Sequence, residues 1–531
     1  MSLSRCLSAF VAACLCAPVW AAGDSPSLEK TNRLVVQFKA QAQAQQAPAG
    51  LPRRPPLDRA REQIAVLAGR AGIPMAASHV LGDGSVVVRL ESPRSVNDAR
   101  ELARRVAAQS DVESVGVDVW VRRQAFLPND VHFPQQWALQ PRSGGIAGSA
   151  LFSDAWDVDD AAFTGSPSVI VALIDTGRVP HVDLAANEID GYDFVSSGTV
   201  GGVEVAGDGD GRDPDPSDPG DFCPISPFAS DRVSSWHGLK MSSIIAALTD
   251  NVQGIAGAAP GVRVQHVRAL GRCGGWLTDV ADALRWAAGG TVAGVPANPS
   301  AGQVRVANLS LGSVPGLDCD SSDFRYMRDA VRAAEAAGVV VVAAAGNEAE
   351  PSVGLPAGCP GVIAVGAHTS LGDLADYSNR SSRITLTGPG GGCSAVDSRI
   401  CDAELIVTLG NNGETTPGDG LWRDDTSGTS AAAPFVSAAA ALMISLEDTL
   451  TPHQVRTILA ETTRSHPAGT YCTINPGVCG TGMLDAEAAV LRVRDGPIPD
   501  GARRSGGGGS LAWGWLALLG LAALRARRLQ T

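Results

Sequence analysis

The stretch Val169-Ile170-Val171-Ala172-Leu173-Ile174 is an uninterrupted apolar run that leads directly into Asp175-Thr176-Gly177. A strand without polar alternation is expected to be buried on both faces, as in a parallel sheet. Helical patterns separate several runs of this kind, which predicts an α/β fold with a doubly wound, mostly parallel sheet. The other runs lie at 262–267, 304–309, 339–345 and 362–365, and the helical patterns at 277–288 and 323–337.

Polar residues stand where these strands and helices are expected to begin or end. Asp175 follows the first run, Asn347 follows the run at 339–345, and His237 precedes an apolar helical stretch at 239–248. Loops beyond the carboxyl ends of parallel strands build the site in such folds. Each residue also has a structural alternative, as a strand-end cap, a turn residue or a helix N-terminal residue. Their joint placement favours a single site.

A serine completes this set in Gly428-Thr429-Ser430-Ala431-Ala432-Ala433-Pro434, which opens an apolar helical run at 435–443. Unpaired amides and the positive end of a helix favour developing negative charge there. Ordinary helix starts also use glycine and serine. A nucleophilic serine needs a histidine base, an orienting acid and oxyanion donors. His237, Asp175 and Asn347 are the candidates for these roles.

Five motifs resemble, in the same order, those of the subtilisin-like serine proteases. The resemblance covers about residues 126 to 490 and implies a subtilisin-like peptidase domain at 126–495. It also implies that Asp175, His237 and Ser430 form a catalytic triad, with Asn347 and the Ser430 amide as the oxyanion hole. The motifs are Ile174-Asp175-Thr176-Gly177, His237-Gly238, Asn308-Leu309-Ser310-Leu311-Gly312, Ala345-Gly346-Asn347 and Gly428 through Pro434.

The resemblance also locates a binding segment for extended polypeptide substrates. Ser310, Leu311 and Gly312 would pair with the substrate backbone by strand addition, and Ala345 and Gly346 would adjoin it. Two motifs depart from the family pattern. Leu239-Lys240 follow His-Gly where Thr and His are usual, and Ala431 and Phe435 replace Met and His near the serine. We expect these departures to affect specificity more than proton transfer.

Residues 24–123 read as a separate small α+β unit. Strands are predicted at 34–38, 85–90 and 112–121, with helices at 59–71 and 95–109, in a β-α-β-α-β order. An Ala/Gln/Pro-rich stretch at 40–56 is expected to be an insertion. The unit resembles the ferredoxin-like inhibitory propeptide of the same family, which would act on its own enzyme as inhibitor and folding aid. Its removal would require cleavage near 122–125.

Both ends of the chain carry membrane-directed patterns. An apolar run at 7–20 follows Arg5 and predicts a signal peptide at 1–21, cut by signal peptidase; a short membrane anchor is the alternative. At 501–531, a Gly-rich linker precedes a short apolar helix and arginines. This tail resembles a sorting segment of Gram-negative exported proteins. It implies transient membrane retention and processing by a rhomboid-like protease, whereas an interfacial helix is the alternative.

The remaining composition fits an exported protein. Eight of the 11 cysteines lie beyond the signal segment, and an even number in an exported chain predicts disulfides. Cys472 and Cys479 are the simplest local pair; metal ligation is the alternative, but there is no Cys-x-x-Cys pattern to support it. The net charge of −13, without a basic stripe, argues against nucleic acid as a partner.

An acidic insertion between Asp175 and His237 is a candidate calcium site. Six carboxylates stand close together there, and oxygen-rich loops suit Ca²⁺, although the spacing is not that of an EF-hand. A solvated acidic loop is the alternative. Asp183 resembles the carboxylate of another calcium site in the family. The candidate ligands are Asp183, Asp208, Asp210, Asp213, Asp215 and Asp221.

Together these features predict a secreted serine endopeptidase that forms an acyl-enzyme on Ser430 and activates itself by removing its propeptide. An exported esterase could use the same constellation, but the usual Gly-x-Ser-x-Gly elbow is absent. A catalytically silent surface-binding protein on the same scaffold is the alternative from another functional class.

Overall fold

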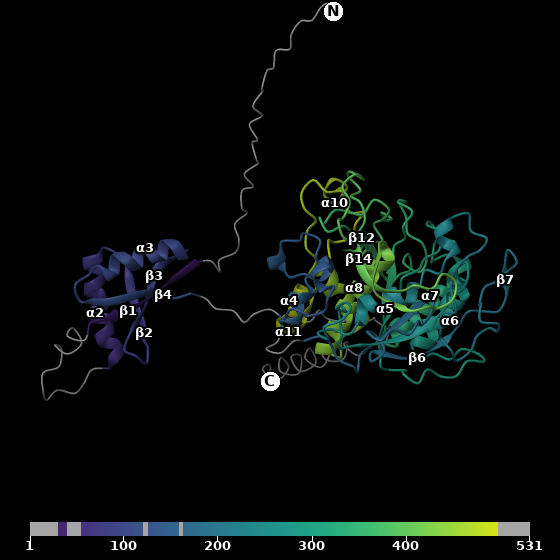
Figure 1. The fold of residues 1–531 in the computed structure, drawn as a ribbon, viewed down its shortest axis with the longest axis horizontal. Helices are drawn as coiled ribbons and strands as arrows, with labels where there is room; N and C mark the ends of the chain where they lie inside the picture. The colour runs from purple at the N-terminus through teal and green to yellow at the C-terminus, as the bar shows by residue number, and fades with distance from the viewer. Residues whose placement is uncertain (1–29, 40–54, 120–125, 159–162, 497–531) are drawn as a thin grey trace, which may run out of the picture. The chain divides into compact units, whose positions relative to one another are not determined.

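The computed structural model describes residues 30–39, 55–119, 126–158 and 163–496. These residues fall into two compact units, divided after Gln124 (Figure 1). The predicted signal segment, most of the 40–56 insertion, the cleavage region at 122–125 and the tail at 501–531 lie outside the described residues.

The N-terminal unit is an antiparallel sheet with two helices, in the β-α-β-β-α-β order of ferredoxin-like folds. The strand order is β2-β3-β1-β4. Its core includes Leu34, Ile64, Val88 and Val106, all fully buried. The elements are β1 (Lys30–Phe38), α2 (Pro56–Ala71), β2 (Met75–Val80), β3 (Val86–Ser95), α3 (Val96–Ala107) and β4 (Val112–Val117).

The strand β2 is absent from the predicted β-α-β-α-β order, so that order was wrong by one element. β2 lies at the sheet edge, and each of its residues is either exposed or only partly buried. Its sequence, Met-Ala-Ala-Ser-His-Val, has no apolar alternation because no face of it is fully buried.

The C-terminal unit is built on a seven-stranded sheet in the order β13-β12-β11-β10-β5-β9-β6. Every neighbouring pair in this sheet is parallel, which confirms the predicted fold class. The strands are β5 (Ile170–Asp175), β6 (Glu188–Asp193), β9 (Arg263–Arg268), β10 (Val304–Leu309), β11 (Val340–Ala344), β12 (Ile363–His368) and β13 (Leu386–Pro389).

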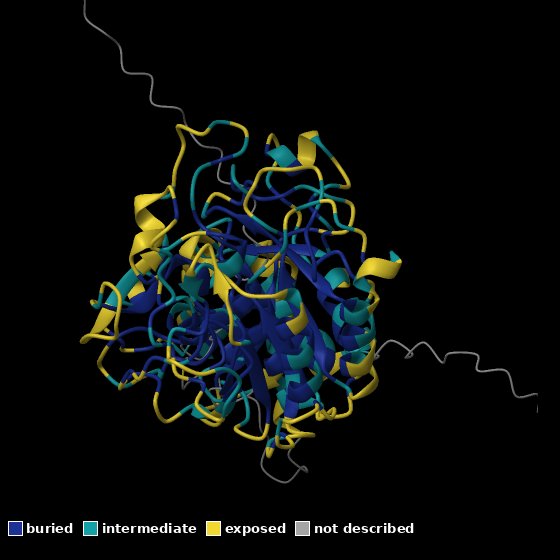
Figure 2. Ribbon diagram, turned by 90° about the vertical axis from the view of Figure 1, so that its right-hand side faces the viewer, coloured by how far each residue is buried: buried dark blue, intermediate teal, exposed yellow. Residues whose placement is uncertain are grey.

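Alternate side chains of β5 enter the two hydrophobic cores on opposite faces of the sheet. Val171 and Leu173 belong to the core that contains α5 (His237–Ala246) and α8 (Thr429–Leu446). Ile170, Ala172 and Ile174 belong to the core that contains α6 (Leu277–Ala287) and α7 (Arg325–Ala336). Figure 2 shows this buried interior in dark blue beneath exposed loops. The apolar run that predicted the fold is therefore buried on both faces.

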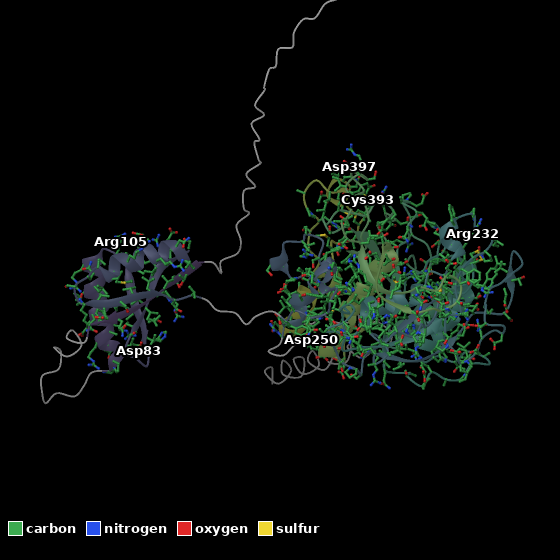
Figure 3. The ribbon with its side chains drawn as sticks, in the orientation of Figure 1. Asp83, Arg105, Arg232, Asp250, Cys393 and Asp397 are labelled. Atoms are coloured by element: carbon green, nitrogen blue, oxygen red, sulfur yellow. A yellow bond between two sulfur atoms is a disulfide. The ribbon has the colours of Figure 1, made fainter. Side chains whose placement is uncertain are left out.

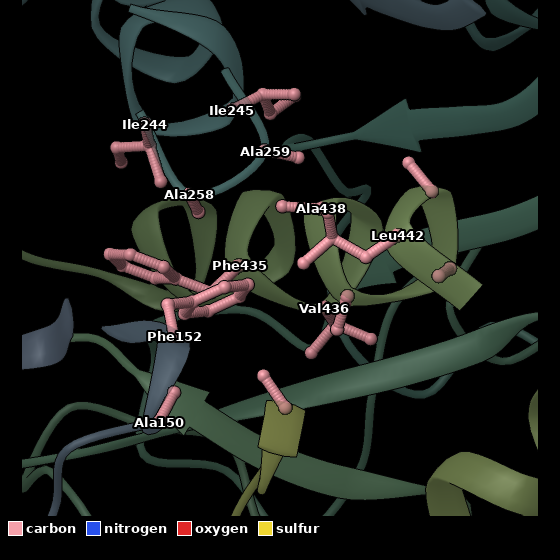
Figure 4. Close-up of a cluster of buried hydrophobic side chains, with 14 of the residues drawn as sticks. Ala150, Phe152, Ile244, Ile245, Ala258, Ala259, Phe435, Val436, Ala438 and Leu442 are labelled. Carbon is pink, nitrogen blue, oxygen red and sulfur yellow. The ribbon is translucent and has the colours of Figure 1, made fainter. Parts of the chain in front are cut away.

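The helix α8 forms the centre of the first core. It is long and apolar enough to cross a membrane, but 83% of the relevant window is buried inside the unit, as in a soluble core helix. In Figure 4, Ile244 and Ile245 lie on one side of α8 and Phe152 on the other. Phe435 packs against Phe152 with ring centroids 6.0 Å apart. Phe435 therefore belongs to the core and not to a substrate pocket.

Shorter elements and disulfides complete the unit. The antiparallel pair β14 (Ile406–Asn411) and β15 (Gly420–Thr426) lies next to α5, and the acidic insertion carries the small hairpin β7 (Thr199–Val200) and β8 (Val203–Glu204). The remaining α-helices are α4 (Phe152–Trp156), α9 (Pro452–Glu461), α10 (Tyr471–Ile474) and α11 (Ala486–Asp495).

All eight cysteines beyond the predicted signal segment form disulfides. The local pair that the sequence suggested, Cys472–Cys479, is one of them. Cys393, labelled in Figure 3, pairs with Cys401, and the other two bridges join more distant segments. These are Cys223–Cys273 and Cys319–Cys359.

Candidate active site

Asp175 and His237 meet at the carboxyl edge of the parallel sheet. Asp175 is the last residue of β5 and is 1% exposed. His237 is the first residue of α5, and its Nδ1 lies 2.7 Å from Asp175 Oδ1. The backbone N–H of Thr176 donates to the same carboxylate oxygen at 2.8 Å. Asp175 is thus held in place and fixes the Nδ1–H tautomer of the imidazole, leaving Nε2 to accept a proton.

The electrostatic setting favours a protonated intermediate on His237. Burial opposes the charged imidazolium, but the charge of Asp175 and its hydrogen bond outweigh this, so the pKa of His237 is raised above 6.5. Asp221 also raises that pKa, whereas Lys240 lowers it. Lys240 itself pairs with Asp424 at 2.9 Å.

The turn into α5 explains why histidine is followed by glycine. A Cβ at Gly238 would lie 2.2 Å from the carbonyl oxygen of Gly177, so a side chain cannot fit there. The Gly238 N–H donates to Thr176 Oγ1 at 3.0 Å. Trp236, just before the helix, has a φ of +53° and is anchored by its indole N–H on the carbonyl of Gly413 at 2.8 Å. This strained turn fixes where His237 enters the site.

Ser430 is the second residue of α8, behind Gly428 at the helix start. Its backbone N–H belongs to the first turn, whose amides have no partner within the helix. Its hydroxyl donates to the carbonyl of Ser310 at 3.0 Å. Among the described residues no hydrogen bond joins Ser430 to His237, although such contacts are often loose before substrate binds.

A proline makes the carbonyl of Ser430 available to a side chain. Pro434 stands four residues after Ser430 in α8 and has no N–H to donate to that carbonyl. The hydroxyl of Ser310 donates to it instead at 2.7 Å. Asn308 Nδ2 donates to Ser310 Oγ at 2.9 Å, and Ser437 Oγ donates to Asn308 Oδ1 at 2.8 Å. This chain of hydrogen bonds begins and ends on α8 and holds the helix against β10.

Asn347 follows β11 and presents an amide donor next to Ser430. Its Oδ1 accepts from Thr429 N at 2.8 Å and from Thr429 Oγ1 at 2.9 Å, so Nδ2 must point away from that residue. A Cβ placed on Gly428 would lie 3.4 Å from Asn347 Nδ2 and 3.6 Å from Ser430 N. Two donors therefore border the same small space, as an oxyanion site requires.

A cleft of about 480 Å³ adjoins His237. Ser310, Leu311 and Gly312, which were predicted to pair with a substrate backbone, line it. Ala345 does not: it is 1% exposed, and its carbonyl accepts from Asn379 Nδ2. Gly346 is not among the residues that line this cleft, and its N–H donates to Thr429 Oγ1. The cleft is also lined by residues that the sequence analysis missed, which include Thr176, Leu270, Gly271, Cys273, Gly274 and Gly275.

The structure separates the six candidate calcium ligands. Oxygen atoms of Asp208 and Asp213 lie within 4.8 Å of each other and of Asp193, which the sequence analysis had not considered. Arg268 already pairs with Asp193 and Asp208 and supplies a positive charge there. The other three candidate ligands from the insertion are not part of this group. Asp210 is exposed, Asp215 accepts from Ser217, and Asp221 lines the cleft and accepts from Ser235.

Asp183 lies in a different environment, with a second buried carboxylate nearby. Asn251 Nδ2 and the Ile255 N–H donate to Asp183, and burial raises its pKa to about 6. The charge of Asp130, which is 2% exposed, raises that pKa further. Asp130 Oδ1 has no hydrogen-bond partner. Buried carboxylates of this kind need compensation, and a hard cation that prefers oxygen ligands would provide it. Asp130 gave no signal in the sequence.

Comparisons with known proteins agree with this geometry. The profile of the peptidase S8, or subtilase, family matches residues 166–487. An extracellular protease of Xanthomonas campestris is 38% identical over 473 residues, which are 88% of this chain and 73% of the relative. An extracellular basic protease of Dichelobacter nodosus is 34% identical over 80% of this chain and 65% of its own length. A solved protease of Pseudoalteromonas arctica has 39% identity and a TM-score of 0.59, covering 69% of this chain and 99% of that one.

Proposed function

The chain belongs to the subtilase family, and on that premise we propose that it is a secreted serine endopeptidase. The observation that carries the proposal is the Asp175–His237 hydrogen bond beside a substrate-sized cleft, with Ser430 at the adjoining helix start. The Xanthomonas and Dichelobacter relatives are both named as extracellular proteases, and this similarity supports secretion.

In the proposed reaction, Ser430 Oγ attacks the carbonyl carbon of a peptide bond while His237 Nε2 takes the hydroxyl proton. This requires the hydroxyl to turn from the Ser310 carbonyl toward His237. Asp175 stabilises the imidazolium through Nδ1–H. His237 then gives the proton to the leaving amine, and the acyl group remains on Ser430. Water, deprotonated by the same imidazole, hydrolyses that ester and restores the serine.

The negative charge that develops on the carbonyl oxygen would be held by Asn347 Nδ2 and the Ser430 N–H. Both donors border the space that Gly428 leaves open. Their orientation is fixed before the reaction, because Thr429 restrains the oxygen of Asn347 and α8 restrains the backbone of Ser430. Donors of this kind need no reorganisation as charge develops.

An extended polypeptide would lie in the cleft and pair with the segment Ser310–Leu311–Gly312, opposite Gly271–Gly275. Casein hydrolysis that is blocked by a serine-directed phosphonate, and absent from Ser430→Ala, tests this function. A purified protein that hydrolyses only esters would favour the esterase alternative. A protein that cleaves neither substrate after removal of its N-terminal unit would favour a silent binding protein.

We also propose that residues 24–123 inhibit the enzyme, assist its folding and are removed by self-cleavage near 122–125. The ferredoxin-like architecture of the described part supports this role. Ser430→Ala should then accumulate with its N-terminal unit attached, whereas the parent protein loses it. If both proteins are processed alike, another protease makes the cut.

We propose that both ends of the chain are processed, and this proposal rests on the sequence patterns at 1–21 and 501–531 alone. Signal peptidase would remove residues 1–21, and a rhomboid-like protease would process the tail at 501–531 after transient membrane retention in a Gram-negative bacterium. Mass spectrometry of the mature protein fixes both ends. An intact tail in the culture medium would contradict the processing step.

We propose a structural Ca²⁺ near Asp183, with Asp130 as a further oxygen ligand. The unpartnered Oδ1 of buried Asp130 and the raised pKa of Asp183 support a cation there. Chelation with EDTA should lower the melting temperature, and added Ca²⁺ should restore it. Asp130→Asn should weaken this dependence. We also propose a second Ca²⁺ in the acidic insertion, at Asp208 and Asp213, which Asp213→Asn tests separately. A melting temperature insensitive to EDTA would contradict both sites.

A further inference from the structure

Among the described residues that line the cleft beside His237, one has an acidic side chain, Asp221. The others are glycines, apolar side chains, hydroxyl side chains, a bridged cysteine and His237. Asp221 therefore sets the sign of the local potential that a substrate side chain meets in this cleft.

Asp221 is held rigidly in the wall of the cleft. Its Oδ1 accepts from the backbone N–H of Ser235 at 2.7 Å, and its Oδ2 accepts from the Ser235 hydroxyl. Two residues later, Cys223 is bridged to Cys273, which also lines the cleft. The disulfide thus ties the segment with Asp221 to the wall at Gly271–Gly275, and the carboxylate keeps a defined position relative to His237.

The charge of Asp221 is not cancelled by a neighbouring cation. The described residues give it no salt bridge, since its partners are both groups of Ser235. Lys240, three residues after His237, pairs with Asp424 instead. The guanidinium of Arg272 stacks over the ring of Phe222 at 4.7 Å and donates to the carbonyl of Gly207. Neither cation lines the cleft.

We propose that Asp221 is a specificity-determining residue, selecting substrates with Lys or Arg at P2, the residue immediately before the one whose carbonyl is attacked. The inference rests on the proposed function and adds a substrate class to it. Successive side chains of an extended peptide point to opposite sides. A substrate paired with Ser310–Leu311–Gly312 and attacked beside His237 would turn its P2 side chain toward His237. Asp221 lines the same cleft and lies close enough to that imidazole for its charge to raise the pKa of His237.

The expected preference is moderate because the site is open to water. A charge pair about 4 Å apart interacts weakly in bulk water and several-fold more strongly near a protein surface. Solvent and salt reduce this gain at half-exposed sites. We therefore expect kcat/KM for P2 Lys to exceed that for P2 Ala by about fivefold, and P2 Glu to fall below Ala by a similar factor.

Three quenched peptides, identical except for Lys, Ala or Glu at P2 of a site that the enzyme cuts in casein, test the proposal. Asp221→Asn should bring the Lys-to-Glu ratio of kcat/KM close to one. Asparagine can still accept from the Ser235 N–H, so the geometry of the wall is preserved. Asp210→Asn, an exposed acid of the same insertion that does not line the cleft, is the matched control and should keep the parent ratio.

Because the Lys-to-Glu ratio of kcat/KM is taken within each variant, differences in overall rate between variants do not affect it. For the parent alone, raising NaCl from about 0.05 to about 0.5 M should shrink the ratio by screening, which keeps the test valid if Asp221→Asn folds poorly. A parent ratio near one, or an unchanged ratio in Asp221→Asn, overturns the role of Asp221 while leaving the peptidase intact. Failure to cleave casein or any of the three peptides refutes the proposed function itself.

Discussion

Replacing Ser310 by alanine should damage both the stability of the fold and the rate of the reaction. The hydroxyl of Ser310 supplies the hydrogen bond to the Ser430 carbonyl that Pro434 cannot make. It also accepts from Asn308 Nδ2. Alanine would leave that carbonyl and that amide without partners in a region where Ser310 is 3% exposed and Asn308 is fully buried.

The magnitude follows from those two groups. Each buried polar group left unsatisfied costs about 1–3 kcal/mol, so the loss of partners for two groups should lower the free energy of unfolding by about 2–6 kcal/mol. The Ser430 carbonyl would also lose its fixed position, and misplacement of a nucleophile by about 1 Å can cost about 10²-fold in rate. We expect kcat to fall by about 10- to 100-fold. KM should change less, because the backbone carbonyl of Ser310 remains.

Unfolding by urea, followed on phosphonate-inactivated protein so that self-digestion does not interfere, measures the first effect, and peptide hydrolysis measures the second. Ser437→Ala is the matched control, since it removes the far end of the same chain of hydrogen bonds without touching Ser430. It should destabilise by about 1–3 kcal/mol and leave kcat largely intact. If Ser310→Ala unfolds like the parent and keeps its kcat, the hydrogen-bond chain has no role in placing the nucleophile.

Three further changes test other parts of the account. Asn347→Ala should lower kcat by about 10²–10³-fold with little change in KM, and an unchanged kcat would remove Asn347 from the oxyanion site. Because the pKa of His237 is raised, kcat/KM should fall as the pH drops through a value above 6.5. Asp175→Asn should move this acidic limb of the pH profile to lower pH and cut kcat by about 10⁴. An acidic limb at the same pH in Asp175→Asn would argue against electrostatic coupling of Asp175 and His237. Burial lowers the pKa of His368 to about 3. Between about pH 6.5 and 3, this histidine is therefore protonated in the unfolded chain but neutral in the folded protein. The free energy of unfolding should therefore fall by up to about 1.4 kcal/mol per pH unit over that window, and His368→Gln, compared by urea unfolding at pH 7 and pH 5, should show a smaller fall.

The sequence was sufficient for the five central strands of the large sheet and for the polar residues at its carboxyl edge. Strands such as β5 are buried on both faces, so their apolar runs stand out, and Asp175 is conspicuous as the first charge after such a run. The edge strands β2 and β6 and the strand β15 have exposed residues and weaker patterns, so they were not predicted. The buried strands β13 and β14 were not predicted either.

The missing parts of the site depend on contacts between residues far apart in the chain. Asp130 lies near Asp183 because the loop around Asp250 folds back onto Asp130. No local sequence pattern predicts this contact. The acidic insertion shows the opposite case. Its carboxylates are close in sequence but separate in space, because Asp221 lines the cleft and Asp208 pairs with Arg268.

The central claim is that Ser430 is a nucleophile activated by His237. Reaction with a serine-directed phosphonate, followed by peptide mapping by mass spectrometry, tests this most directly. The account predicts one adduct, on Ser430, whose rate of formation falls by orders of magnitude in His237→Ala and rises with pH through the pKa of His237 in the parent. An adduct on another residue, or equal labelling of the parent and His237→Ala, would contradict it.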